Sequence, residues 1–112
     1  MHSWLRIFAL ALLLVTASHA QTFRQLPANG KLGQLTGGQQ QPYPLVTINE
    51  QVVRLAPGGR IYDENNRLIV HGALPSSAPV VFVADSNGDV SRIFVLRADE
   101  LAQIQQRLQQ QQ

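Results

Sequence analysis

Arginine and aromatic side chains in the second half of the chain have the chemistry to bind an anionic or flat ligand: Arg60, Tyr62, Arg67 and Arg92. Guanidinium groups form charge-assisted hydrogen bonds with anions, and an aromatic ring offers a surface for stacking. Small open barrels often bind ligands on one face that carries such residues. One interpretation of these residues is therefore a ligand-binding face, which requires that the three arginines point in the same direction as an exposed aromatic ring.

Catalytic chemistry has little support in the sequence. His71 is the only histidine after residue 20, and the chain contains no cysteine. No serine near His71 lies in a nucleophile-elbow pattern, and no neighbouring residue is suited to orient its ring. We expect an exposed histidine or one at a strand edge, and no enzyme. An enzyme that relies on carboxylates such as Asp63, Glu64 or Asp85 is the alternative.

Two acidic segments could bind a cation, but both fit a turn better. Residues 85–89 read Asp-Ser-Asn-Gly-Asp, which is similar to the start of a calcium loop. Such a loop needs glycine at its sixth position and a carboxylate at its twelfth, where this chain has Val90 and Leu96. Residues 63–66 read Asp-Glu-Asn-Asn, a composition typical of a solvated turn. We expect no metal site and no cofactor.

The first twenty residues have the pattern of an export signal. A basic residue, Arg6, precedes the apolar run Ile7 to Val15, and Ser18-His19-Ala20 provides a small-residue end, so we expect cleavage after Ala20. The apolar run is far shorter than the roughly 20 residues that span a membrane. Because the chain has no cysteine, it can form neither a lipoprotein anchor nor a disulfide. The sequence predicts a periplasmic or secreted protein without a membrane anchor.

The segment 21–44 is rich in Gln, Gly, Pro and Thr. It offers too little apolar area to offset the entropy of ordering, so we expect a flexible leader. Three leucines leave room for one short strand within it: Leu26, Leu32 and Leu35.

Residues 45–97 have the pattern of a β domain of three hairpins, with short apolar segments between turn residues. The expected strands are residues 45–48 with 52–55, 60–62 with 67–70, and 80–85 with 90–96. The first turn is Asn49-Glu50-Gln51, and Pro57-Gly58-Gly59 is expected to turn the chain between the first two hairpins. Residues 71–79 are expected to form a connecting loop.

The third hairpin contains Asn87-Gly88, the preferred pair for a two-residue type I′ turn. Counting outward from this turn places the following residues opposite one another: Ala84 and Ser91, Phe82 and Ile93, Val81 and Phe94, Val80 and Val95. Both faces of this hairpin are apolar, which is typical of central strands in a barrel or of strands covered by a helix.

Residues 98–112 predict a helix with a glutamine-rich tail, because they contain good helix formers and neither Gly nor Pro. Leu101, Ile104 and Leu108 form one apolar stripe, which we expect to dock on the sheet while the glutamines stay solvated. The predicted fold is mainly β (α+β). It is a small antiparallel sheet or partly open barrel of five to six short strands with one C-terminal helix.

Several segments of the β domain resemble a group of small exported proteobacterial proteins of uncharacterised function. The similar segments are Val53 to Asp63, Leu74-Pro75, Ala78-Pro79-Val80, Asp85 to Val90 and Ile93 to Leu96. The resemblance supports the predicted strands and implies no activity and no site residues. The first hairpin turn of that group commonly ends in Gly, whereas this chain has Glu50.

Taken together, the sequence favours a non-catalytic structural or interaction module of the cell envelope. Edge strands or exposed apolar residues of the sheet would bind an envelope protein. The alternative is a module that binds a small ligand or a polyanion with the arginine and aromatic residues named above. Basic and acidic residues nearly balance after the signal and the basic ones are scattered singly, so we expect no nucleic-acid partner.

Overall fold

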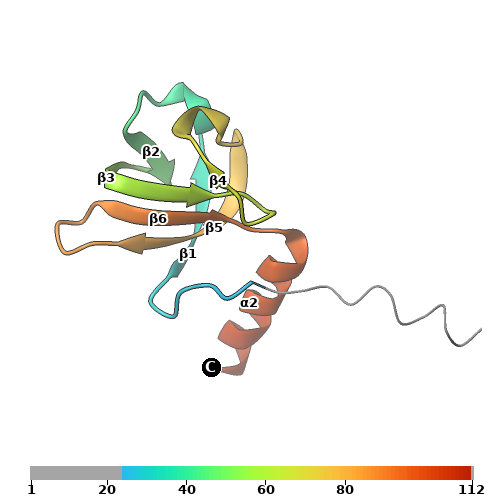
Figure 1. Cartoon of the computed structure of the whole chain (residues 1–112). Helices are drawn as coiled ribbons and strands as arrows, with labels where there is room; N and C mark the ends of the chain where they lie inside the picture. Colours follow the sequence, from blue (N-terminus) through green and yellow to red (C-terminus); the bar gives the residue numbers. More distant parts are fainter. Residues whose placement is uncertain (1–23, 112) are drawn as a thin grey trace, which may run out of the picture.

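Six strands form one mixed sheet in the computed structural model, which describes residues 24–111 (Figure 1). The strands are β1 (Lys31–Thr36), β2 (Leu45–Ile48), β3 (Gln51–Tyr62), β4 (Leu68–Ile69), β5 (Ser77–Ala84) and β6 (Val90–Val95). Two short 3-10 helices, η2 (Gly38–Gln40) and η3 (His71–Ala73), lie in loops, and α2 (Ala98–Gln110) ends the chain. The predicted export signal and residues 21–23 lie outside the described residues.

The sheet curls into a partly closed ring. Its strand order is β2-β1-β5-β6-β3-β4, and an additional pairing of β2 with β3 joins the ring, so that β4 is attached outside it along β3. This arrangement, with one C-terminal helix, confirms the predicted fold class. The pairing of β3 with β6 is parallel whereas the other pairings are antiparallel. The sequence patterns predict an antiparallel sheet, and the parallel pairing makes it mixed.

The ring encloses an aliphatic core, which we call the interior cluster. Its buried members are Leu35, Val46, Ile48, Leu55, Ile61, Leu74, Ala78, Val80, Val90, Ile93 and Val95. All except Leu74, which follows η3, come from strands, and most lie at even spacings because successive side chains of a strand point to opposite faces of a sheet. Ile61 and Ile93 therefore point inward, and their chain neighbours point to the outer surface.

Strand β1 corrects the expectation of a flexible leader over residues 21–44. It lies between β2 and β5, and Leu35 is fully buried in the ring. The expectation is therefore wrong for Lys31–Thr36, and the alternative of one added strand is confirmed. Leu35 is the only buried side chain of β1, so the alternation that marks a strand is weak here. β1 is specified instead by its backbone pairing with β2 on one edge and with β5 on the other.

A bulge in β3 replaces the turn expected at Pro57-Gly58-Gly59. Leu55 lies opposite Val90 and Arg60 lies opposite Arg92, so four residues of β3 stand against one residue of β6. Gly58 has a φ of 73°, in the left-handed region that glycine adopts without strain. The chain bulges at this point and continues in the same direction. As a result, one strand pairs with β2 over its first half and with β4 at its end.

The third hairpin has the predicted register over most of its length but a different turn. Gly88 has a φ of 81° and Asn87 has no positive φ, which excludes a type I′ turn. The Asp85 N–H donates to the Asp89 carbonyl at 2.7 Å, so the loop has three residues. A bulge then shifts the pairing by one residue, and Ala84 faces Val90 rather than the expected Ser91. The pairs Val80–Val95, Val81–Phe94 and Phe82–Ile93 are confirmed.

The first hairpin has a two-residue turn. Ile48 pairs with Gln51, and both residues between them have a positive φ, 54° at Asn49 and 66° at Glu50. This is the geometry of a type I′ turn, in which the second position favours glycine. Glu50 therefore adopts a conformation that costs an ordinary L-residue about 1 kcal/mol.

Helix α2 covers part of the outer face of the sheet. The contact, which we call the outer cluster, contains buried Val81, Phe94 and Leu96 with partly buried Leu26, Leu32, Tyr62, Leu101 and Ile104. The docking expected of the apolar stripe is confirmed for Leu101 and Ile104 and is wrong for Leu108, whose residue surface is 48% exposed. Within residues 24–111, no helix is long and apolar enough to span a membrane.

Candidate functional site

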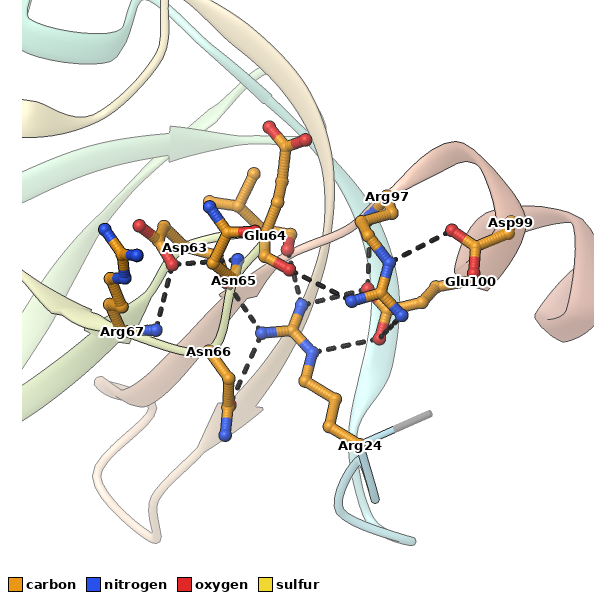
Figure 2. A network of polar contacts seen from close by, with 10 residues as sticks. Arg24, Asp63, Glu64, Asn65, Asn66, Arg67, Arg97, Asp99 and Glu100 are labelled. Carbon is orange, nitrogen blue, oxygen red and sulfur yellow. Dashed lines mark hydrogen bonds and ion pairs between the residues drawn. The ribbon is translucent and has the colours of Figure 1, made fainter. Parts of the chain in front are cut away.

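The most extensive polar network of the described chain surrounds Arg24 (Figure 2). Arg24 lies before β1, and its side chain is only 8% exposed. Its five N–H donors make five hydrogen bonds: to Glu100 Oε2 at 2.9 Å, Glu100 Oε1 at 3.0 Å, the Asp63 carbonyl at 2.6 Å, the Val95 carbonyl at 2.6 Å and Asn66 Oδ1 at 3.5 Å. The guanidinium also lies 5.6 Å from the centre of the Phe94 ring.

This network connects three distant parts of the chain. Arg24 joins the segment before β1 to the loop after β3 and to the first turn of α2. Glu100 is 3% exposed and also accepts the backbone N–H of Arg97 at 3.1 Å, which caps the helix. Since every donor of Arg24 is used, the network has a structural role and leaves no group of Arg24 for a ligand.

Arg97 extends the network to the surface. Its Nε donates to Asp99 Oδ1 at 3.1 Å, and its Nη1 donates to the Glu64 carbonyl at 3.1 Å. The hydrogen bond from Arg97 lowers the pKa of the Asp99 carboxyl, and the same bond raises the pKa of Arg97. Asp99 and Glu100 also lie in the first turn of α2, where negative charge is favourable.

The two acidic segments form loops of the same design. Asp63 Oδ1 accepts the N–H groups of Asn65 and Arg67, each at 2.9 Å. Asp85 Oδ1 accepts the N–H groups of Asn87 at 2.9 Å and of Asp89 at 3.0 Å. In each loop the carboxylate therefore stabilises its own turn. Among residues 24–111, no group of three or more His, Cys, Asp or Glu side chains is arranged to hold a metal ion.

The predicted ligand-binding face is brought together only in part. Arg60 and Arg92 are direct neighbours in the parallel pairing of β3 with β6. Tyr62 and Phe94 are the next outward-facing pair, and their rings stack at 4.9 Å and 11°. Tyr62 is thus half-buried in the outer cluster rather than exposed. Arg67 lies in the loop between β3 and β4 and is not part of the strand pairing that joins Arg60 and Arg92.

Two arginines occupy directly opposite positions on neighbouring strands. In the described part of the chain, neither Arg60 nor Arg92 forms an ion pair. Like charges on directly opposite residues of neighbouring strands repel each other. An anion placed between the two guanidinium groups would offset that repulsion.

A groove opens beside the edge strand β4, next to Arg60. Its cavity has a volume of about 770 Å³, and we call it the β4 groove. It is lined by Tyr43, Leu55, Gly58, Gly59, Arg60, Ile61, Leu68, Ile69, Val70, His71 and Gly72. Three of these residues are large, apolar or aromatic and mostly exposed, at 67% for Tyr43, 64% for Leu68 and 74% for Val70. Arg60 gives the lining a positive charge at all physiological pH values, and the lining contains no Asp or Glu.

His71 fixes one end of this groove. Its Nε2 lies 2.6 Å from the Leu45 carbonyl oxygen, so this nitrogen carries the proton and donates. The Tyr43 ring meets the imidazole edge to face, with centroids 5.7 Å apart. Of the two expectations, an exposed histidine is wrong, because His71 is half-buried and holds the start of β2 against η3 beside the edge strand β4. The groove lining offers His71 neither a nucleophile nor an orienting carboxylate.

The sequence analysis missed the contribution of Tyr43, Leu68 and Val70. A signal for the last two was present in the run Leu68-Ile69-Val70. Because side chains of a strand alternate, such a run cannot point inward at every position. Ile69 packs against the interior cluster and its two neighbours are exposed.

No protein-family model, curated protein or solved structure matches this chain. The resemblance to small exported proteobacterial proteins stays a prediction. The geometry of the β4 groove and of the neighbouring arginine pair is the basis on which a function can be proposed.

Proposed function

We propose that this protein is a non-catalytic interaction module of the cell envelope, which binds an extended segment of an envelope protein in the β4 groove. The observation that carries this proposal is the exposure of Tyr43, Leu68 and Val70 beside a sheet edge. Exposed apolar groups that cluster around a groove are typical of interaction sites, whereas single exposed ones are ordinary.

The edge of β4 suits strand addition. In the described part of the chain, β4 pairs with β3 on one side and has no strand on the other. An extended peptide can pair with the backbone of such an edge while its alternate side chains enter neighbouring pockets. Leu68 and Val70 flank the backbone that would pair, so the apolar contacts and the main-chain hydrogen bonds would form together.

The charge of the groove indicates the character of the segment. Arg60 lies in the lining without an acidic neighbour, and Arg92 lies beside it on β6. An apolar segment with one carboxylate, from an acidic side chain or a chain end, would place that group near both guanidinium groups. The bound anion would offset the repulsion between them.

The site of action follows from the predicted export signal. Residues 1–20 predict transfer across the inner membrane and cleavage after Ala20. The proposed partner is therefore a protein of the periplasm or of a membrane face exposed to it.

Site-specific photo-crosslinking in the native cell tests this proposal. A photoreactive phenylalanine analogue at Leu68 should give one defined adduct with an envelope protein. The same analogue at Val52, which is 56% exposed but outside the β4 groove, is the matched control. The substitution Arg60→Glu should remove the adduct at Leu68 because it reverses the charge of the groove.

Equal adducts at both positions, or an adduct at Leu68 that survives Arg60→Glu, would contradict the proposal. In either case the crosslinks would report contacts that do not depend on the chemistry of the groove. Circular dichroism of Arg60→Glu would show whether the variant stays folded, which is expected of an exposed position.

A second candidate function is polyanion binding, and the observation that favours it is the opposite placement of Arg60 and Arg92 on β3 and β6. Arg60 and Arg92 could bind an inorganic polyanion without using the apolar residues of the groove. Titration with polyphosphate separates the two functions. Polyphosphate binding that is lost in Arg92→Gln but retained in Leu68→Gln would favour the polyanion module.

A further inference from the structure

A second cavity is lined by α2 and by the segment that precedes β1. Figure 1 shows these two parts of the chain side by side. The cavity has a volume of about 940 Å³, within the range of small-molecule sites. We call it the α2 cleft. Its lining comes from the segment 24–32, from residues along α2 between Glu100 and Gln111, and from Val81 on the outer face of the sheet.

The lining of the α2 cleft is about half apolar. Its apolar lining includes Leu26, Pro27, Leu32, Val81, Ile104 and Leu108. Leu26, Leu32 and Ile104 are partly buried against the outer cluster, whereas Leu108 is 48% exposed at the open end. The apolar stripe of α2 thus continues beyond the contact with the sheet and faces the cleft.

The rim of the α2 cleft has an uncompensated positive charge. Lys31 and Arg107 both line it, both are exposed, and within residues 24–111 neither forms an ion pair. The acidic residue of the lining, Glu100, is buried and hydrogen-bonded to Arg24. The charge that a ligand meets is therefore that of two exposed cations beside the apolar part of the lining.

We propose that the α2 cleft binds a single-chain amphiphile with a carboxylate headgroup, such as a free fatty acid. The acyl chain lies along Leu26, Ile104 and Leu108, and the carboxylate lies at the rim with Lys31 and Arg107. Burial of the chain removes apolar surface of Leu108 from water, and the headgroup compensates the two cations. This inference is independent of the β4 groove, because the two sites share no residue.

Titration of the purified protein with decanoate below its micelle concentration tests the inference. Saturable binding is expected, with amide NMR shifts confined to residues 25–32 and to the second half of α2. Decyltrimethylammonium has the same chain and the opposite charge, and should bind at least about tenfold more weakly because the rim repels it.

Variants of the rim separate a charge-specific site from simple apolar adsorption. Lys31→Glu/Arg107→Glu should reverse the preference, so that decyltrimethylammonium binds more tightly than decanoate. Both side chains are exposed and free of ion pairs, so the fold should tolerate the change. Leu108→Gln should weaken both probes several-fold, whereas Val52→Gln, an exposed site outside the cleft, should leave both unchanged.

Several results would overturn the inference. These are the absence of saturable decanoate binding, equal binding of both probes, and NMR shifts at the β4 groove instead of the cleft. A concentration-dependent dimer that Leu108→Gln abolishes would show that a second copy occupies the cleft. Binding to anionic vesicles without binding of free decanoate would show adsorption to a membrane surface.

Discussion

The interior cluster and the outer cluster both bury apolar side chains, but they are assembled in different ways. The buried members of the interior cluster are all aliphatic, and all except Leu74 come from strands. The outer cluster joins the sheet to α2 and to the segment before β1, and the buried pair of Arg24 and Glu100 lies at its border. The first is closed by apolar packing within the ring. The second also depends on one saturated guanidinium group.

The two ends of the described chain are held by hydrogen bonds of Arg24 as well as by apolar contacts. Leu101 and Ile104 are partly buried in the outer cluster, so apolar contact alone attaches α2 weakly. Arg24 adds hydrogen bonds that reach α2, the end of β6 and the loop after β3. Replacing Arg24 should therefore destabilise α2 and the segment before β1, whereas the interior cluster does not depend on this side chain.

The largest effect is expected for Arg24→Met. It removes five hydrogen bonds and leaves Glu100 buried without its main cation, which typically costs about 3–5 kcal/mol. Chemical denaturation measures the loss of unfolding free energy. Arg107→Met, an exposed arginine on α2, is the control and should change it by less than about 0.5 kcal/mol.

Arg24→Lys sharpens this test, because it keeps the charge and cannot make the five-bond pattern. An intermediate loss is expected. If Arg24→Met were as stable as the wild type, the outer cluster would be held by apolar packing, and its contrast with the interior would disappear.

A comparable loss of unfolding free energy is expected for a truncation inside the ring. Ile93 is fully buried, and Ile93→Ala should cost about 2–5 kcal/mol through lost apolar burial and a residual cavity. Ile104→Ala in the outer cluster should cost less, because that side chain is only partly buried. Thermal and chemical denaturation measure both losses. If Ile104→Ala lowered the unfolding free energy as much as Ile93→Ala, α2 would pack against the sheet as tightly as the side chains inside the ring.

A smaller effect of opposite sign is expected at a turn of the ring. Glu50→Gly relieves a positive φ of 66° and should stabilise the protein by about 1 kcal/mol. Asn66→Gly, at a φ of 63° in the loop that contacts Arg24, should change stability less, because Asn tolerates this region and its Oδ1 contact is lost. A destabilising effect of Glu50→Gly in thermal melting would contradict the type I′ turn.

The smallest effect concerns the pH dependence of the partly exposed pair at the start of α2. The hydrogen bond from Arg97 lowers the pKa of Asp99 in the folded state. The stabilisation is therefore present above the unfolded-state pKa, about 4, and is lost as the pH falls through the lower folded-state pKa. Asp99→Asn should reduce the melting temperature at pH 7, and the difference from the wild type should vanish at low pH. A difference that stays constant with pH would exclude this pair as its source.

Local sequence patterns predicted the second and third hairpins and the start of α2. The register Val80 to Val95 was predictable although the turn was wrong, because the three-residue loop and the bulge at Ser91 shift the pairing in opposite senses. Side-chain alternation in this hairpin extends over enough apolar residues to fix the faces. The β4 groove was only partly predictable, since Arg60 was named and Tyr43 was not.

Elements without a local pattern were not predictable. β1 has one buried side chain and is specified by its neighbours on both edges. The parallel pairing of β3 with β6 joins segments far apart in the chain, and no turn sequence encodes it. The continuation of β3 through Pro57 to Gly59 depends on the two different strands that pair with its halves.

The sequence by itself determined a small, cysteine-free, mainly β protein with a C-terminal amphipathic helix, because alternation and helix propensity act over a few residues. Only the tertiary structure decided that the ring is joined through β1, that Arg24 is buried against Glu100, and that Arg60 lies beside Arg92. Each of these features depends on partners that are distant in sequence. Their free energy is realised only when the ring brings those partners together.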